Sequence, residues 1–138
     1  MVDGYYNILK DRYNHIVQIK DYNNTGNVLV YIQNIDLSYL KNYYEDFIEY
    51  VYLTCLKCLD ISKQYNKSTY CVHVYLENVT KKNYSLKLYK ALIKKLEENL
   101  KDVMSICYIY NANDMTKKLF NIISIFIDPV TVRKFRLV

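Results

Sequence analysis

The chain has little glycine and proline and no tryptophan: two Gly and one Pro occur among 138 residues. So few turn-forming residues argue against a sandwich or barrel of many short strands and favour strands joined by helices. No apolar run approaches the ~20 residues that a transmembrane helix needs, and the first residues lack the apolar stretch of a secretory signal. Apolar residues still make up 51% of the chain, which excludes intrinsic disorder. The length suits a single domain over residues 1–138.

Lysine greatly outnumbers arginine, and the 17 tyrosines are spread along the whole chain. Lysine, asparagine and tyrosine have AT-rich codons, so the composition predicts an AT-rich genome, such as that of a giant DNA virus or certain protists. The tyrosines could instead stack on nucleic acid, but the net charge of +5 is not gathered into a basic block. We therefore expect no specific nucleic-acid partner. We also expect a cytoplasmic location, in the host cytoplasm or the virion if the protein is viral.

The four cysteines raise the question of a metal or redox site: they are Cys55, Cys58, Cys71 and Cys107. Cys55 and Cys58 have the spacing of zinc ligands, and Cys71 with His73 could supply a second pair. The helical pattern favours another interpretation, because Cys55 and Cys58 fall on an apolar stripe that begins at Leu37. Such a stripe faces the core, where a free cysteine behaves as a small hydrophobe. We expect Cys55 and Cys58 to be buried, reduced and free of metal.

Helical and strand patterns alternate along the chain. The expected helices cover residues 3–13, 36–62, 85–100 and 113–127, and the expected strands lie near 16–19, 28–33, 69–76, 104–110 and 133–138. The first two strands form a hairpin with Gly26 at its turn, and Asp36 is the expected N-cap of the long helix. The strand at 69–76 is apolar on both faces, as in a buried strand. This order predicts an α/β fold with a mostly parallel sheet and right-handed crossovers.

The helix expected near residues 115–127 has too little polar surface for an ordinary surface helix. One apolar stripe runs through Met115, Leu119, Ile122 and Phe126, and a second lies beside it at Phe120, Ile123 and Ile127. The first stripe is expected to face the core. The second needs a further cover, which is more core, a ligand such as a lipid acyl chain, or a partner protein.

The same region carries a resemblance to a known family. Asn111-Ala112, Phe120 and the run Phe-Ile-Asp-Pro-Val-Thr-Val-Arg-Lys at 126–134 resemble the CRAL-TRIO domain. The resemblance implies a mixed, mostly parallel sheet with flanking helices and an apolar gate-like helix, which together hold one lipid or other hydrophobe. It also implies that Asp102 and Lys134 serve a lipid headgroup. Family members continue with a further segment that helps to close the pocket, so the resemblance indicates a minimal, truncated CRAL-TRIO-like domain.

Two functions remain open at this point. The first is a non-enzymatic interaction or structural module that self-associates, or binds a partner protein, through the helix at 115–127. The alternative is a lipid-binding or lipid-transfer module that works at a membrane surface. No Ser/His/Asp or Cys/His spacing indicates catalysis, and no metal or cofactor is expected apart from a bound lipid.

Either function uses the same apolar residues, which form a pocket or an interface: Met115, Leu119, Phe120, Ile123, Phe126 and Ile127. A hollow of roughly several hundred Å³ behind this helix would favour a lipid, and a filled interior would favour an interaction module.

Overall fold

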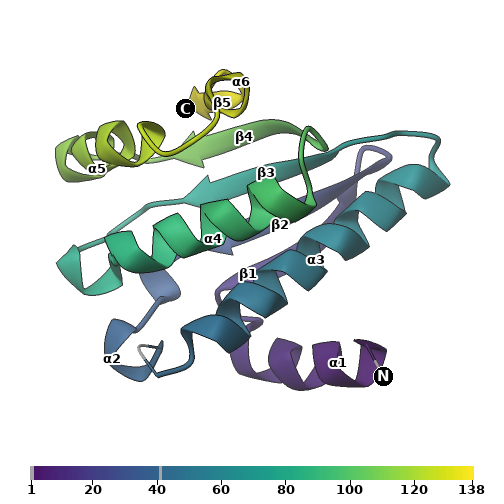
Figure 1. The fold of residues 1–138 in the computed structure, drawn as a ribbon, viewed down its shortest axis with the longest axis horizontal. Helices are drawn as coiled ribbons and strands as arrows, with labels where there is room; N and C mark the ends of the chain where they lie inside the picture. The colour runs from purple at the N-terminus through teal and green to yellow at the C-terminus, as the bar shows by residue number, and fades with distance from the viewer. Residues whose placement is uncertain (1, 41) are drawn as a thin grey trace.

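The computed structural model describes residues 2–40 and 42–138 and shows helices packed on one β-sheet (Figure 1). The helices are α1 (Val2–Tyr13), α2 (Leu37–Leu40), α3 (Tyr44–Gln64), α4 (Leu86–Asn99), α5 (Asp114–Ser124) and α6 (Pro129–Val132), with 3-10 turns η1 (Ile32–Asn34) and η2 (Lys81–Asn83). The strands are β1 (Val17–Tyr22), β2 (Thr25–Tyr31), β3 (Tyr70–Tyr75), β4 (Met104–Tyr110) and β5 (Phe135–Leu137). The predicted α/β class and the predicted order of elements are confirmed.

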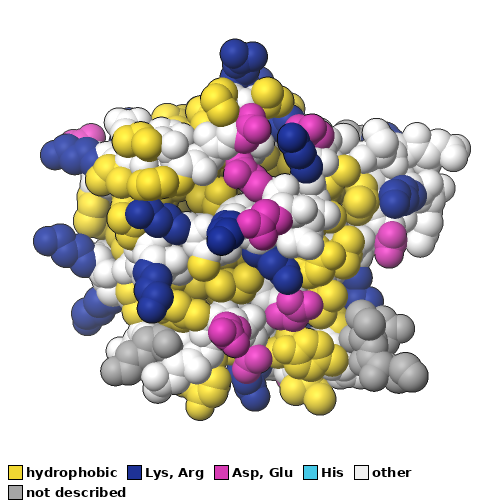
Figure 2. Space-filling model, viewed as in Figure 1, with side chains coloured by type: hydrophobic (Ala, Val, Ile, Leu, Met, Phe, Trp, Pro, Cys, Tyr) yellow, Lys and Arg dark blue, Asp and Glu magenta, His cyan; other side chains and the backbone are white. Residues whose placement is uncertain are grey.

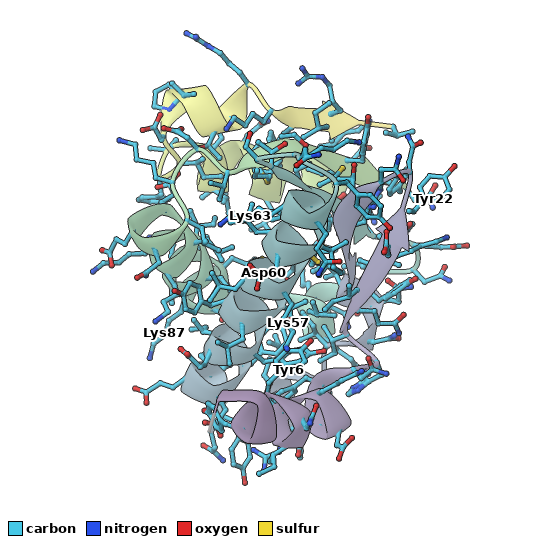
Figure 3. The ribbon with its side chains drawn as sticks, turned by 90° about the vertical axis from the view of Figure 1, so that its right-hand side faces the viewer. Tyr6, Tyr22, Lys57, Asp60, Lys63 and Lys87 are labelled. Atoms are coloured by element: carbon cyan, nitrogen blue, oxygen red, sulfur yellow. The ribbon has the colours of Figure 1, made fainter. Side chains whose placement is uncertain are left out.

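The five strands lie in the sheet in their order in the sequence, β1-β2-β3-β4-β5. The β1–β2 pair is antiparallel and the three following pairs are parallel. Each parallel connection moves one strand further in the same direction, so right-handed crossovers place α3, α4 and α5 on the same face of the sheet. Figure 1 shows α3 and α4 in front of the strands, and in Figure 3 the green α4 lies at the left and the purple β1–β2 hairpin at the right, with α3 between them.

The hairpin between β1 and β2 turns at two asparagines. Asn23 and Asn24 have φ of 57° and 59°, the left-handed conformation that a two-residue hairpin turn requires. The prediction that Gly26 forms the turn is wrong, because Gly26 lies within β2 and has no positive φ. Gly26 is needed because the backbone of α3 passes close to it: a Cβ at this position would lie 2.0 Å from the carbonyl oxygen of Cys58. Glycine at this position lets α3 lie directly on β2.

The single helix expected over residues 36–62 is two helices. Asp36 does cap the first, since its Oδ1 accepts the backbone N–H of Ser38 at 3.0 Å. That helix, α2, ends at Leu40, and α3 begins at Tyr44, directly after Asn42 and Tyr43, which are weak helix formers. Even α3, at 21 residues, is not apolar enough to cross a bilayer, and the same holds for every other helix among the described residues.

An aromatic part of the core joins α1 and α3 to the first two strands. Phe47 and Tyr50 of α3 are each 1% exposed, and Tyr13 of α1 is completely buried. Tyr13 packs edge-on against Phe47, with ring centroids 5.3 Å apart. The Tyr50 hydroxyl donates to the carbonyl of Val17 at 2.6 Å. Each buried aromatic side chain contributes about 1.5–3 kcal/mol, so this end of the fold stabilises the whole.

Cys55 and Cys58 are buried in this core, as predicted, and all four cysteines are free. Cys71 and His73 share a face of β3 with Tyr75, on the side of the sheet away from α3. The sheet therefore separates the two halves of the zinc set considered above. In the described part of the chain, no group of His, Cys, Asp and Glu is arranged to hold a metal ion.

The prediction that strand 69–76 is buried on both faces is wrong. Within β3 only Tyr70 is fully buried. Val72 and Val74 line a cavity beneath the helices, whereas His73 and Tyr75 lie half-buried on the face without helices. Both faces of this strand therefore differ from an ordinary packed core.

Candidate functional site

A cavity of about 760 Å³ lies between the helices and the sheet. Its floor is made of alternate side chains of the central strands: Val28, Val30, Val72, Val74, Cys107 and Ile109. Its roof is one side of α4: Tyr89, Leu92, Ile93 and Leu96. A third wall comes from α5: Leu119, Phe120 and Ile123. Because α4 packs closely on α3 and α5 rather than on the strands, the space beneath it forms the cavity.

Most of the polar residues that line the cavity belong to α4 and to the segments that precede β4 and β5. They are Lys90, Lys94, Glu97, Glu98, Lys101, Asp102, Thr131 and Lys134. Asp102 comes just before β4 and Lys134 just before β5. Since β4 and β5 are parallel neighbours, Asp102 and Lys134 lie toward the same end of the sheet. The cavity thus combines an apolar interior with charged groups at the amino ends of two strands.

Helix α5 is held at both of its ends. At the start, Asn113 Oδ1 accepts a backbone N–H one turn further on at 2.8 Å, a standard N-cap. Beyond the end, the backbone N–H of Asp128 donates to Glu97 Oε1 of α4 at 2.9 Å. The Lys90 ammonium of α4 also lies 3.8 Å from the centroid of the Phe126 ring, within range of a cation–π interaction. These two contacts tie the segment that follows α5 to α4.

The thiols in the cavity wall are unsuited to nucleophilic chemistry. Burial raises the pKa of the Cys55 thiol to about 12, and it raises the pKa of Cys107 well above the ordinary value for cysteine. The reactive form of cysteine is the thiolate. Both side chains are therefore protonated at neutral pH and act as apolar wall.

Two tyrosines lie where α4 begins, and their hydroxyls differ. The Tyr89 hydroxyl donates to the carbonyl of Asn83 at 2.8 Å. The Tyr84 hydroxyl is buried and has no hydrogen-bond partner among the residues that the structure describes, although Tyr84 lines the cavity. Burial raises the pKa of Tyr84 to about 12. An unpaired buried hydroxyl costs about 1–3 kcal/mol, so Tyr84 provides a polar group for which the cavity contents can supply a partner.

With this geometry in hand, comparison with known proteins decides the family: a family model described as the CRAL/TRIO domain matches residues 12–138. The chain belongs to the CRAL-TRIO family. Among solved structures it is similar to the crystal structure of Sfh5, a yeast protein, with a TM-score of 0.79 and 14% sequence identity. The match covers 92% of this CRAL-TRIO chain but only 50% of the Sfh5 chain. A comparison with curated protein sequences finds no match.

The structure places most of the predicted site residues of this CRAL-TRIO chain around one space. Five of the six apolar residues line the cavity: Leu119, Phe120, Ile123, Phe126 and Ile127. Met115 is half-buried and lies outside the cavity wall. Asp102 and Lys134, assigned to a headgroup by resemblance alone, line the same cavity.

The predicted division of the gate-like helix into a core-facing and an outer stripe is wrong. Ile122 and Phe126, which were expected to face the core, are 47% and 50% exposed. Ile127, from the other stripe, is only 6% exposed, and Phe120 packs edge-on against a phenylalanine ring of β5. Helix α5 ends at Ser124 rather than at 127, so the residues after it leave the helical pattern on which the stripes were drawn.

The role of α4 as the cavity roof could not be found by sequence reasoning. Its apolar stripe has the spacing of an ordinary core helix, and the basic and acidic residues on its other side suggest a solvent-exposed face. In α4, all of which the structure describes, Leu88 is the single fully buried residue. Residues such as Leu92 and Leu96 are only partly buried because they face the cavity. Periodicity shows that these residues share a face, but not what lies opposite.

Proposed function

We propose that this chain is a non-enzymatic lipid-binding module that holds one lipid or other hydrophobe between the sheet and helices α4 and α5. The observation that carries the proposal is the cavity, because about 760 Å³ lies within the ~300–1,000 Å³ typical of ligand pockets. Membership of the family supports it, since CRAL-TRIO domains bind lipids. The cavity also favours this function over self-association through 115–127, which we expected to accompany a filled interior.

Binding would be non-covalent and driven by burial of the apolar part of the ligand. Each buried CH₂ group contributes about 0.8 kcal/mol, and valines and leucines of the floor and roof supply the surface for it. The Lys134 ammonium suits a phosphate, and the Asp102 carboxylate suits hydroxyl donors of a headgroup. Tyr84 precedes α4, whereas Asp102 follows it. A helix of 14 residues is roughly 21 Å long, so the Tyr84 hydroxyl and the Asp102 carboxylate lie toward opposite ends of the cavity roof.

The outer side of α5 and the residues that follow this helix support exchange of the ligand at a membrane. Ile122, Ile125 and Phe126 are 47%, 77% and 50% exposed, and Val130 of α6 is 51% exposed. Exposed basic residues lie beside them in the sequence: Lys117, Lys118 and Arg133. Figure 2 shows hydrophobic side chains at the surface over α5 and α6, with Lys and Arg next to them. Apolar side chains bordered by basic ones are typical of surfaces that dock on anionic bilayers.

The geometry supports no catalytic assignment. His73 lies on the face of the sheet opposite the cavity, and the cavity thiols are protonated at neutral pH.

Free thiols are the norm in the cytoplasm, so the four free cysteines agree with a cytoplasmic location, which we include in the proposal.

The test compares two substitutions on the same helix. Ile123 lines the cavity, whereas Ile122 lies on the outer side of α5. Ile123→Asp places an uncompensated charge in an apolar space, which is costly, so the amount of copurified lipid seen by native mass spectrometry is expected to fall about tenfold or more. Ile122→Asp is expected to retain the lipid. Circular dichroism confirms that both variants are folded.

Light scattering separates the two functions considered from the sequence. A lipid-free wild-type protein that forms dimers, which Ile122→Asp dissociates, would contradict the proposal and support self-association. Equal lipid retention by both variants would also contradict it, because the cavity would then not be the binding site.

A further inference from the structure

The side of the sheet away from α3 and α4, which we name the open face, has its own composition. The strand registers place the following residues on it: Gln18, Lys20, Tyr22, Thr25, Asn27, Leu29, Tyr31, Cys71, His73, Tyr75, Tyr108, Tyr110 and Arg136. Figure 3 shows Tyr22 projecting from the strands on the side opposite α3. Parallel strands are normally covered by helices on both faces. Here the described residues supply a helical layer on one face only.

The aromatic rings of the open face stack on one another across three parallel strands. Tyr31 and Tyr75 have ring centroids 4.9 Å apart and planes inclined by 11°. Tyr75 and Tyr110 have centroids 4.8 Å apart and planes inclined by 12°. The ring faces therefore lie against neighbouring rings. We name Tyr31, Tyr75 and Tyr110 the tyrosine row. Its ring edges and hydroxyl groups are the parts that can contact a partner.

A part-buried hydrogen-bond chain fixes the middle of the open face. The Asn27 amide nitrogen donates to backbone carbonyls of the hairpin, among them that of Thr25 at 3.0 Å, which directs Oδ1 toward His73. His73 Nε2 then donates to this Oδ1 at 2.9 Å, and Nδ1 accepts the Tyr110 hydroxyl at 2.8 Å. The central side chains are thus ordered before any partner binds, which reduces the entropy cost of association.

The charges of the open face are of one sign. Its two charged residues are Lys20 on β1 and Arg136 on β5, at opposite edges of the sheet. Asp21 is the one acidic residue in the strands, all of which are described, and it lies on the helical side, where it accepts the Tyr65 hydroxyl at 3.2 Å. Four strand spacings of about 4.8 Å separate β1 from β5, which puts the two cations roughly 19 Å apart.

We propose that the open face binds a helical segment of another protein, whose apolar and hydrogen-bonding middle lies on the tyrosine row and whose acidic residues meet Lys20 and Arg136. Such a segment supplies the second helical layer that a parallel sheet normally has. A helix of roughly 13 residues spans the 19 Å or so between the two cations. Interface cores are rich in Tyr and Arg and poor in carboxylates, which agrees with the composition of the face.

Two other occupants fit less well. A second copy of this chain would bring like charges together: a two-fold axis along the strands sets Lys20 against Arg136, and an axis across them sets Lys20 against Lys20. Single-stranded nucleic acid needs open ring faces on which bases can stack, and the Tyr31, Tyr75 and Tyr110 rings already stack on each other.

The test selects helical peptides from a displayed library. Each peptide has about 18 residues, ~27 Å as a helix, with a fixed apolar stripe and flanking positions that vary among Glu, Gln and Lys. Selection on the wild-type protein is expected to enrich Glu at the flanks. The best peptide is expected to bind the Lys20→Glu, Arg136→Glu variant about tenfold more weakly. A matched charge reversal on the helical side, Lys87→Glu with Lys117→Glu, is expected to change affinity by less than about twofold.

Reversed peptides with Lys at the flanks are expected to bind the Lys20→Glu, Arg136→Glu variant better than the wild type. If that variant fails to fold by circular dichroism, Lys20→Gln with Arg136→Gln carries the same test, with a loss of about threefold. Enrichment of Gln or Lys at the flanks, or equal binding to both charge-reversal variants, overturns the proposal. Binding of a dU oligonucleotide that is tighter than binding of the best peptide also overturns it. So does a wild-type dimer whose dissociation constant changes in the Lys20→Glu, Arg136→Glu variant. These outcomes do not depend on whether the cavity holds a lipid.

Discussion

The two faces of the sheet are built by the same strands but differ in what covers them. On the helical face, Val28, Val72 and Ile109 present short branched side chains beneath a helix that packs on its neighbours, and a cavity results. On the open face, Tyr31 and Tyr75 cover the strands by stacking sideways. Side chains alternate between the two faces along a strand, so consecutive residues of one strand contribute in turn to the aliphatic floor of the cavity and to the tyrosine row. The space for a ligand therefore comes from short side chains on the floor and from the position of α4.

The largest effect is expected where the helical layer touches the sheet most closely. Gly26→Ala places a Cβ 2.0 Å from the carbonyl oxygen of Cys58, so α3 must shift away from β2. We expect the free energy of unfolding to fall by about 3 kcal/mol. Gly4→Ala is the control, since a Cβ there meets nothing within 4 Å and alanine is about 1 kcal/mol better than glycine in a helix. Urea unfolding measures both, and similar values would contradict the close packing of α3 on β2.

A pair of leucines on α4 distinguishes packed core from cavity wall. Leu88 is completely buried, whereas Leu96 faces the cavity. Leu88→Ala is expected to lower the free energy of unfolding by about 3 kcal/mol, and Leu96→Ala by about 1 kcal/mol in lipid-free protein, because little packing is lost beside an existing space. Equal losses in chemical denaturation would mean that the space under α4 is filled.

The two tyrosines near the start of α4 are expected to respond in opposite directions. Tyr84→Phe removes a buried hydroxyl that has no partner in the described part of the chain, so the free energy of unfolding of the lipid-free protein should rise by about 1 kcal/mol. Tyr89→Phe removes a hydroxyl bonded to the Asn83 carbonyl, so it should lose about 1 kcal/mol. Thermal unfolding of delipidated protein measures both changes. Destabilisation by Tyr84→Phe would show that its hydroxyl is already paired.

The smallest effect belongs to the open face and depends on pH. Burial, and then the charge of Lys20, lower the pKa of His73 below the ordinary value of 6.5. The unfolded chain therefore binds a proton more readily, so stability is full above about pH 6.5 and falls as the pH drops toward the folded pKa. The imidazole contacts Asn27, Cys71 and Tyr110, the Tyr108 ring stacks on it, and the charge of Lys20 acts on it. His73→Gln is expected to remove this part of the slope between about pH 7 and 5.5 in urea titrations, and an unchanged slope would contradict the assignment.

Much of the fold follows from the sequence because strand and helix periods are local properties. The alternation of elements and the burial of Cys55 and Cys58 were predicted correctly. The break before Tyr44 and the faces of α5 were not predicted correctly, because both depend on the residue at which a helix ends. Residues beyond that point no longer follow the helical repeat, so their side chains point in other directions. The pocket was predicted only in outline: Phe120 and Ile123 were identified, but Leu96 and Tyr84 carry no pattern that separates cavity from core. The AT-rich origin and the headgroup roles of Asp102 and Lys134 stay predictions.

The agreement between strand order in the sheet and strand order in the sequence has a consequence for synthesis of the chain. Each new strand pairs with the strand made immediately before it, so no strand waits for a partner that the ribosome has yet to produce. The part with α1, the hairpin and α3 emerges before α4 and α5 and can serve as a template for them. The elements that enclose the cavity, α4 and α5, emerge after their floor has begun to form. Hydrogen exchange on stalled nascent chains is expected to show protection of β1 and β2 before α5 leaves the ribosome.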